Sequence, residues 1–329
     1  MIRRRWLEIV AAMFATTVLR TAQAGDNKSE LVLVVMDPLA LPLSCPCVKG
    51  YAQRKYEHLG VYLTQQLARP VKVFWSESLE KAMKEKTEGR ADLVIGKHSV
   101  VLSDAKRTSQ TMTPFASLTG KDGKTTQTGL VLVRHDDKAK NVDDLVGYRI
   151  FFGTAECDEK LAAPAKLLKA HGVSIPDKPE TYPACSDSAA ALLELPKDAK
   201  AAAVISSYAA PLLEGCGTIQ KGDLRVVAES EPVPFVTAFM NGRLADDERA
   251  AISKAMLDVG TRAELLIALE TKAGFVAWKE STEKVVAKKK SSPIRRRTAT
   301  GRAGEGRIVT AALRGCRRLS PPACPRYGR

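Results

Sequence analysis

Cysteine is the residue type whose placement in this chain points most directly to chemistry. The 329 residues include seven cysteines, and four of them stand where an apolar, strand-like stretch gives way to a helical pattern: Cys45, Cys47, Cys157 and Cys185. In a parallel α/β sheet these transitions gather at one edge, which is where ligands bind. The placement therefore predicts a thiol-lined binding site at that edge.

Other polar side chains occupy the same kind of position. A histidine and several hydroxyl groups follow the predicted strands at 93–96 and 202–205, acids adjoin Cys157, and threonines lie near a predicted crossover at 126–128. We therefore expect the following residues to contact a ligand: Cys45, Cys47, His98, Ser99, Thr126, Thr128, Cys157, Asp158, Glu159, Cys185, Ser186, Ser206, Ser207 and Tyr208.

Three chemistries are open to these cysteines. Thiolates and an imidazole suit a thiophilic or borderline metal such as zinc or copper, and its ligands would be Cys45, Cys47, Cys157 and His98. In an exported protein, a structural disulfide between Cys157 and Cys185 is the alternative. The third chemistry is that of an exported thiol redox protein using Cys45 and Cys47, although the spacing is not the CxxC pattern of thioredoxin-like proteins.

The beginning of the chain has the pattern of an export signal. Three arginines at 3–5 precede an apolar stretch at 9–19, which is too short to span a bilayer, and the small residues of AQA at 22–24 provide a cleavage site. We predict that residues 1–24 are a removed signal peptide. The mature protein is then expected to be soluble in the periplasm or another extracytoplasmic compartment.

The net charge of +14 comes from the two ends of the chain. Residues 288–329 carry 13 basic residues against the single acid Glu305, whereas the 34 basic and 35 acidic residues of 25–287 nearly cancel. We predict that 288–329 is a disordered basic tail or a stretch translated out of its natural frame. Because the body is nearly neutral and exported, we expect no nucleic-acid partner.

The elements that would position the site alternate in type. Apolar stretches predict strands at 31–36, 71–75, 93–96, 129–133, 149–152, 202–205, 224–228 and 235–239. Helical patterns lie between most of them, at 51–67, 79–86, 159–170, 188–195, 209–213 and 246–269. This alternation predicts an α/β fold of mostly parallel sheets with helices on both faces.

Four segments of the body together carry a family resemblance. They read ADLVIG at 91–96, DLVGYRIFFG at 144–153, AAVIS at 202–206 and ESEPVP at 229–234. With these segments, the chain resembles the phosphate/phosphite/phosphonate-type periplasmic solute-binding proteins of ABC importers. The resemblance extends from about residue 31 to about residue 278.

The resemblance implies a two-lobed, type 2 periplasmic-binding fold with a ligand cleft between the lobes. Lobe 1 would comprise 25–127 and 226–287, and lobe 2 would comprise 128–225. The family further implies a monomer that captures a small-molecule or metal ligand, without catalysis, for an ABC permease or a sensor. The chain also lacks the usual sequence motifs of serine hydrolases, zinc proteases and P-loop enzymes.

The turn at 153–159 departs from the family pattern. Members of the family place serine and threonine hydroxyls there, at a helix N-terminus that cradles an oxyanion. This chain instead reads GTAECDE, and its three acids would repel a phosphonate in a partly desolvated cleft. We therefore expect a ligand other than a phosphonate, with a metal as one alternative.

Overall fold

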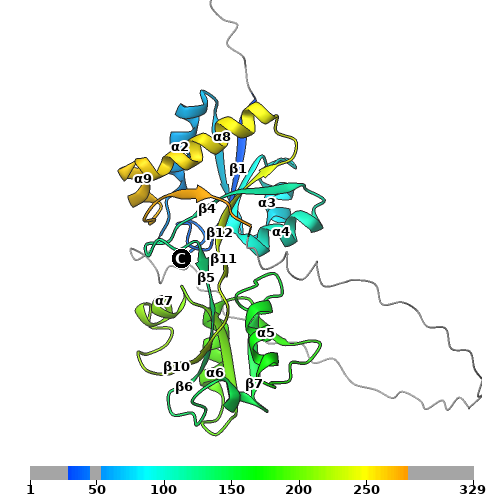
Figure 1. The fold of residues 1–329 in the computed structure, drawn as a ribbon, viewed down its shortest axis with the longest axis vertical. Coiled ribbons are helices and arrows are strands. Elements are labelled where there is room, and N and C mark those ends of the chain that lie inside the picture. Colours follow the sequence, from blue (N-terminus) through cyan, green and yellow to red (C-terminus); the bar gives the residue numbers. More distant parts are fainter. Residues whose placement is uncertain (1–28, 45–52, 281–329) are drawn as a thin grey trace, which may run out of the picture. The chain divides into compact units, whose positions relative to one another are not determined.

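The computed structural model describes residues 29–44 and 53–280 (Figure 1). Cys45 and Cys47, the predicted signal peptide and the predicted basic tail lie outside the described residues, so what was predicted for them stays a prediction. The described residues form two larger sheets, each flanked by helices. We call the parts built on these sheets lobe 1 and lobe 2.

Lobe 1 is built on a six-stranded sheet with the strand order β13-β4-β12-β3-β1-β2. Its strands are β1 (Leu31–Met36), β2 (Val71–Trp75), β3 (Leu93–Lys97), β4 (Met112–Leu118), β12 (Val236–Asn241) and β13 (Phe275–Ala277). Strand β1 runs parallel to β2 and β3, whereas β12 runs antiparallel to β3 and β4. The last part of the chain thus completes a sheet that the first part begins.

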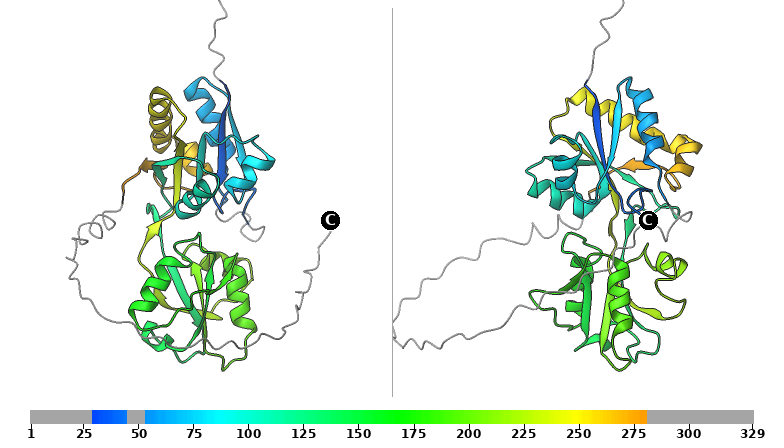
Figure 2. Two further views of the ribbon diagram at one scale, coloured as in Figure 1. Left: turned by 90° about the vertical axis from the view of Figure 1, so that its right-hand side faces the viewer. Right: turned by 180° about the vertical axis from the view of Figure 1, so that it is seen from behind.

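Both faces of the lobe 1 sheet are covered by helices, which are α2 (Tyr56–Leu67), α3 (Leu79–Glu85), α4 (His98–Arg107), α8 (Asp246–Asp258) and α9 (Ala263–Ala268). All six residues of β1 are buried. Alternate β1 side chains point to opposite faces, where one set packs with α2, α8 and α9 and the other with α3 and α4 (Figures 1 and 2). Burial on two faces explains the unbroken apolar sequence LVLVVM.

Lobe 2 is built on a five-stranded sheet with the order β10-β6-β9-β7-β8. Its strands are β6 (Gly129–Arg134), β7 (Arg149–Gly153), β8 (Glu180–Tyr182), β9 (Ala201–Ser206) and β10 (Leu224–Glu229). The helices of this lobe are α5 (Ala162–Ala170), α6 (Cys185–Glu194) and α7 (Ala210–Gly215). Figure 2 shows helices on both faces of this sheet.

A short antiparallel ladder lies where the chain passes between the lobes. It pairs β5 (Thr126–Gln127) with β11 (Val233–Pro234). The first crossover was expected near 126–128, where β5 lies. The boundary expected between residues 225 and 226 falls inside the edge strand β10, which pairs with β6, and the return passage follows this strand at β11.

The two-lobed α/β fold is confirmed, but its sheets are mixed rather than mostly parallel. Strands β7, β8 and β9 are parallel, whereas β6 runs antiparallel to both β9 and β10. The physical reason is the connectivity, because each crossover brings the chain into its new sheet in the opposite direction. Such a return is not visible in the alternation of strand and helix patterns.

Two differences between the expected and observed helices go beyond a shift of their ends. Helix α4 (His98–Arg107) was not predicted, because its polar sequence HSVVLSDAKR buries few apolar side chains. The single helix expected at 246–269 is divided into α8, a 3₁₀ turn (Val259–Thr261) and α9. None of the helices within 29–44 and 53–280 combines the length and the apolar character needed to cross a membrane.

Candidate functional site

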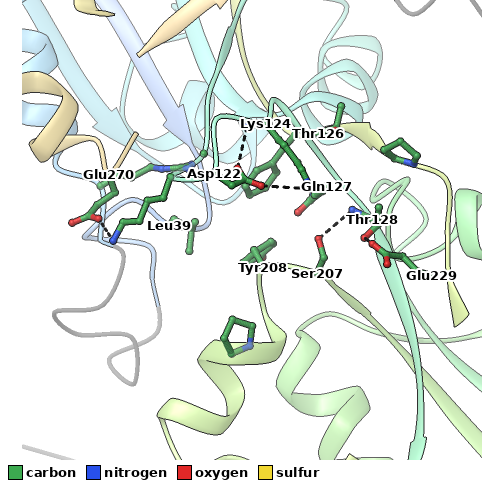
Figure 3. Close-up of a pocket in the computed structure, with 16 residues that line it drawn as sticks. Leu39, Asp122, Lys124, Thr126, Gln127, Thr128, Ser207, Tyr208, Glu229 and Glu270 are labelled. Atoms are coloured by element: carbon green, nitrogen blue, oxygen red, sulfur yellow. Dashed lines mark hydrogen bonds and ion pairs between the residues drawn. The ribbon is translucent and has the colours of Figure 1, made fainter. Parts of the chain in front are cut away.

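A pocket of about 700 Å³ lies beside the β5–β11 ladder, and we call it the hinge pocket (Figure 3). Residues of both lobes and of the ladder line it. They are Leu39, Arg54, Gly120, Lys121, Asp122, Lys124, Thr126, Gln127, Thr128, Ser207, Tyr208, Pro211, Glu229, Pro232, Phe235 and Glu270. Its volume is that of a typical small-molecule site.

Hydrogen bonds of hydroxyl groups and a pair of stacked aromatic rings connect the elements that line the hinge pocket. The backbone N–H of Thr128 donates to Ser207 Oγ at 3.1 Å, and Thr128 Oγ1 donates to Glu229 Oε1 at 2.5 Å. Figure 3 shows Thr128 between these two partners. The ring of Tyr208, from lobe 2, stacks on Phe235 with centroids 5.2 Å apart. The pocket thus has a polar wall and an aromatic wall.

The charged groups that line the hinge pocket have partners within the chain. Lys121 pairs with Glu270, and Lys124 lies 3.8 Å from Asp122. The third cation is buried: Arg54 Nη1 is 2.8 Å from Asp37, which also accepts from Tyr56 Oη at 2.6 Å. Burial by itself would lower the pKa of Arg54, but Asp37 outweighs it and raises the pKa.

Gln127 differs from the other lining residues because its side-chain amide has no hydrogen-bond partner in the described part of the chain. Its exposed fraction is 6%, and neither Nε2 nor Oε1 has a hydrogen-bond partner among the described residues. Within the same residues, Arg54 Nε is also unpartnered. Leaving a buried donor or acceptor unpaired costs about 1–3 kcal/mol. These atoms have almost no accessible surface, so a ligand in the pocket reaches them only after the side chain turns or the lobes move.

A second polar cluster surrounds Lys97, the last residue of β3, and we call it the Lys97 cluster. It consists of Lys97, Cys157, Glu159, Cys185, Ser206 and Tyr208. The ammonium of Lys97 in lobe 1 lies 2.5 Å from Glu159 Oε1 in lobe 2. Ser206 Oγ donates to the same oxygen at 2.8 Å. The carboxylate is therefore held by one group from each lobe.

Sulfur and aromatic groups complete the surroundings of this ammonium. Cys157 Sγ lies 3.9 Å from Lys97 Nζ, and the Tyr208 ring centroid lies 5.3 Å from it. Cys185 lies next to Ser206, whose backbone N–H points to Cys185 Sγ at 3.5 Å. Tyr208 belongs to both the cluster and the hinge pocket. The two sites are therefore adjacent.

The Lys97–Glu159 pair is ionised on both sides at neutral pH. Burial alone would lower the pKa of Lys97, but the acidic groups around it, Tyr208 and Glu159 first among them, raise that pKa well above its ordinary value. Burial alone would raise the pKa of Glu159, but Lys97 outweighs it and the net direction is down. Burial raises the pKa of Tyr208, so this phenol stays protonated.

Two glycines allow the turn that carries Glu159 to pack closely on the lobe 2 sheet. A Cβ on Gly129, the first residue of β6, would lie 2.0 Å from the Glu159 carbonyl oxygen. A Cβ on Gly153, the last residue of β7, would lie 2.4 Å from Lys160 Cβ. The Gly153 N–H also donates to the Lys160 carbonyl at 3.1 Å. The position of Glu159 thus depends on two positions without side chains.

Comparison with known proteins places the chain in a family. The family model described as "ABC transporter, phosphonate, periplasmic substrate-binding protein" matches residues 50–283. The chain belongs to this family. The resemblance noted in the sequence is thereby confirmed, and its members are the solute-binding components of ABC importers rather than enzymes. No curated protein matches the chain.

Solved structures with the fold of this binding protein share little sequence with it. XAC2383 from Xanthomonas citri, bound to ATP, is 15% identical with a TM-score of 0.59, covering 79% of this chain and 95% of that one. A binding protein component of an ABC phosphonate transporter from Pseudomonas aeruginosa is 15% identical, with a TM-score of 0.56. The match covers 76% of this chain and 81% of that one. PhnD1 from Prochlorococcus marinus, in complex with methylphosphonate, is 14% identical, with a TM-score of 0.55. The match covers 79% of this chain and 96% of that one.

The structure brings most of the predicted site residues of this binding protein into two groups. Thr126, Thr128, Ser207 and Tyr208 line the hinge pocket. Cys157, Glu159, Cys185, Ser206 and Tyr208 lie in the Lys97 cluster. Ser99 lies near the second group, because its Oγ accepts from the Asp158 N–H at 3.1 Å. Whether any of them contacts a ligand stays a prediction.

Two predicted residues have other surroundings. His98 stacks on Trp278, with centroids 4.4 Å and planes 10° apart, and also faces Phe239. Ser186 is directed to its neighbour Asp187, at 3.2 Å. Neither side chain lines the hinge pocket.

The two predicted site cysteines that the structure describes, Cys157 and Cys185, are not bonded to each other. Cys157 and Cys185 are free thiols, so the disulfide expected between them is not formed in the structure. Each thiol has a hydroxyl neighbour of its own instead, Thr154 for Cys157 and Ser206 for Cys185. Among the described residues, no three His, Cys, Asp or Glu side chains are grouped to hold a metal. The zinc or copper site stays a prediction, because Cys45 and Cys47 lie outside those residues.

Sequence reasoning missed the groups that organise both sites. Lys97 stands at a strand end, beside His98, but an isolated lysine is ordinarily solvent-exposed. Arg54 and Gln127 follow no motif, and their burial is a result of tertiary packing. The position of Lys97 could have indicated its place in the site. Lys97 is the last residue of β3, just as the predicted site residue Ser206 is the last residue of β9.

Proposed function

We propose that this protein captures a small polar solute in the hinge pocket and delivers it to an ABC permease. Family membership supports the transport role. The pocket supports the place, since both lobes and the ladder between them supply its walls. Closure of two lobes around a ligand is a standard motion of such proteins.

The observation that carries this proposal is the unpartnered amide of Gln127. A native protein rarely buries an amide without partners, and this one lines a cavity large enough for a solute. The solute would offer an acceptor to Nε2 and a donor to Oε1. Its apolar surface would pack on Tyr208 and Phe235, whose stacked rings form the aromatic wall.

The test is a thermal-shift screen of the purified protein against sugars, amino acids, nucleosides, phosphonates and sulfonates. Any compound that raises the melting temperature is then titrated into a Gln127→Met variant. We expect affinity to fall at least about tenfold, because two hydrogen bonds are lost. The matched control is Gln220→Met, since Gln220 is exposed and does not line the pocket. Equal affinity of the Gln127→Met variant and the control would contradict the proposal.

A further inference from the structure

Glu159 occupies a position that is built to hold an anion. Its Oε1 accepts from Lys97 Nζ at 2.5 Å and from Ser206 Oγ at 2.8 Å, and its exposed fraction is 1%. A charge-assisted bond from an ammonium and a second bond from a hydroxyl are what an oxyanion requires. Here the chain's own carboxylate meets that requirement.

Lys97 cannot remain without such a partner. Its exposed fraction is 7%, and removing one charge of a buried pair leaves the other uncompensated at a cost of several kcal/mol. Glu159 is the carboxylate within ion-pair distance of Lys97 in the part of the chain that the structure describes. While this carboxylate is in place, no further anion is needed beside Lys97, and one that approached would be repelled.

The Lys97 cluster adjoins the proposed solute site, although Lys97 itself does not line the hinge pocket. Tyr208 lies over Lys97 and also lines the hinge pocket, and Ser206 is followed directly by the lining residue Ser207. In the hinge pocket itself, Arg54, Lys121 and Lys124 each have an acid of the chain nearby. Among the buried hydrogen-bonding atoms of the described lining, the side-chain amide atoms of Gln127 and one N–H of Arg54 have no partner.

We propose that Glu159 determines specificity by acting as a built-in anion that excludes phosphate, phosphonate and sulfonate groups from Lys97. The solute of the hinge pocket is then not held through an oxyanion at Lys97, a conclusion that rests on the proposed function. Removing the carboxylate without filling its space opens the position beside Lys97 and Ser206 to an external oxyanion.

The experiment measures binding of methylphosphonate and of inorganic phosphate by isothermal titration calorimetry. We expect no detectable binding by the wild-type protein. The Glu159→Ala variant is expected to bind at least one of these anions with an affinity at least about tenfold above the wild-type limit. The Glu159→Gln variant fills the same space and is expected not to bind, although its charge is also removed. The double variant Lys97→Met/Glu159→Ala is expected not to bind either.

Glu156→Ala is the matched control for a general change in charge. Glu156 belongs to the same turn but is half-exposed, and its nearest cation, Arg107, is 3.9 Å away. Equal gains in Glu159→Ala and Glu156→Ala would overturn the proposal, as would failure of folded Glu159→Ala to bind either anion. Should Glu159→Ala not fold, Glu159→Ser replaces it under the same criteria.

The titration of the wild-type protein with methylphosphonate and phosphate tests the role of Glu159 independently of the variants. Submillimolar binding of methylphosphonate or phosphate by the wild-type protein would overturn the role of Glu159, whatever the variants do. That result would leave capture in the hinge pocket intact, because the pocket is tested through Gln127. Conversely, a Gln127→Met variant with undiminished solute affinity would contradict the pocket and leave the anion experiment unaffected.

Discussion

The hinge pocket and the Lys97 cluster lie side by side and share Tyr208, but they differ in whether their buried polar groups have partners. In the cluster, a lysine of one lobe and a carboxylate of the other satisfy each other, with a serine hydroxyl in addition. In the pocket, an amide is buried with neither of its atoms paired among the described residues. The difference indicates which site is completed by the protein and which is left for a solute.

The comparison also separates stability from binding. A satisfied buried ion pair contributes through the cost of breaking it. An unsatisfied amide lowers stability in the empty protein and repays that loss when a ligand arrives. Variants at the two sites should therefore change stability in opposite directions.

The largest expected effect comes from removing one half of the ion pair. Glu159→Ala should lower the free energy of unfolding by about 3–5 kcal/mol, because Lys97 is left charged and buried. Urea denaturation followed by circular dichroism measures the change. The double variant Lys97→Met/Glu159→Gln removes both charges and should recover most of the loss. A loss below about 1 kcal/mol in the single variant would mean that the pair is solvated.

The second expected effect is the pH dependence of the same pair. Because the pKa of folded Glu159 is lowered, its contribution is present above the unfolded value of about 4.3 and is lost as pH falls through the folded pKa. Because the pKa of Lys97 is raised, its contribution is complete below about 10.4 and is lost as pH rises through the folded pKa. The stability difference between wild type and Lys97→Met/Glu159→Gln should thus be flat between these limits. A slope near pH 7 would contradict the assignment.

The third prediction concerns the close approach that seats Glu159. Gly129→Ala places a methyl group 2.0 Å from a backbone oxygen, which cannot move as a flexible side chain would. We expect a loss of about 1–3 kcal/mol in unfolding free energy. Gly215→Ala is the control, since a Cβ there meets nothing within 4 Å and the residue lies in α7. Equal stability of the two variants would show that the turn adapts.

The smallest expected effect has the opposite sign. Gln127→Met removes a buried amide that has no partner in the described structure, so the empty protein should gain about 1 kcal/mol of stability. The melting temperature in the absence of added solutes measures it, with Gln220→Met as the control. A loss of stability would show that the amide is already satisfied, and the contrast between the two sites would fail.

Much of the fold could be predicted from local patterns, and the exceptions have physical causes. The fully buried strands β1 and β9 carry unbroken apolar sequences and were found within a residue of their ends. Helix α4 was missed because its sequence is polar overall and only two of its apolar side chains, Val101 and Ala105, are buried. Strand directions were misjudged because pairing depends on where the chain returns, which local periodicity does not record.

The candidate sites were predicted by position but not by partner. Cys157, Cys185 and Ser206 were expected to meet because strand ends gather at one edge, and they do lie in one cluster. The residue at the centre of that cluster, Lys97, was not expected to be buried. Asp158 and Glu159 were expected to contact a ligand, which stays a prediction, and the structure shows that Glu159 pairs with Lys97.

The sequence by itself determined the family, the two-lobed α/β fold and the turns where functional side chains stand, because these follow from local patterns of apolar and polar residues. Only the tertiary structure decided that Lys97 and Glu159, 62 residues apart, neutralise each other across the lobes, and that Gln127 is buried without a partner among the described residues. The reason is that pairing and burial are properties of long-range packing. In the sequence, the position of Glu159 near Cys157 therefore predicts a ligand-binding group, whereas in the fold its carboxylate is the counter-ion of Lys97.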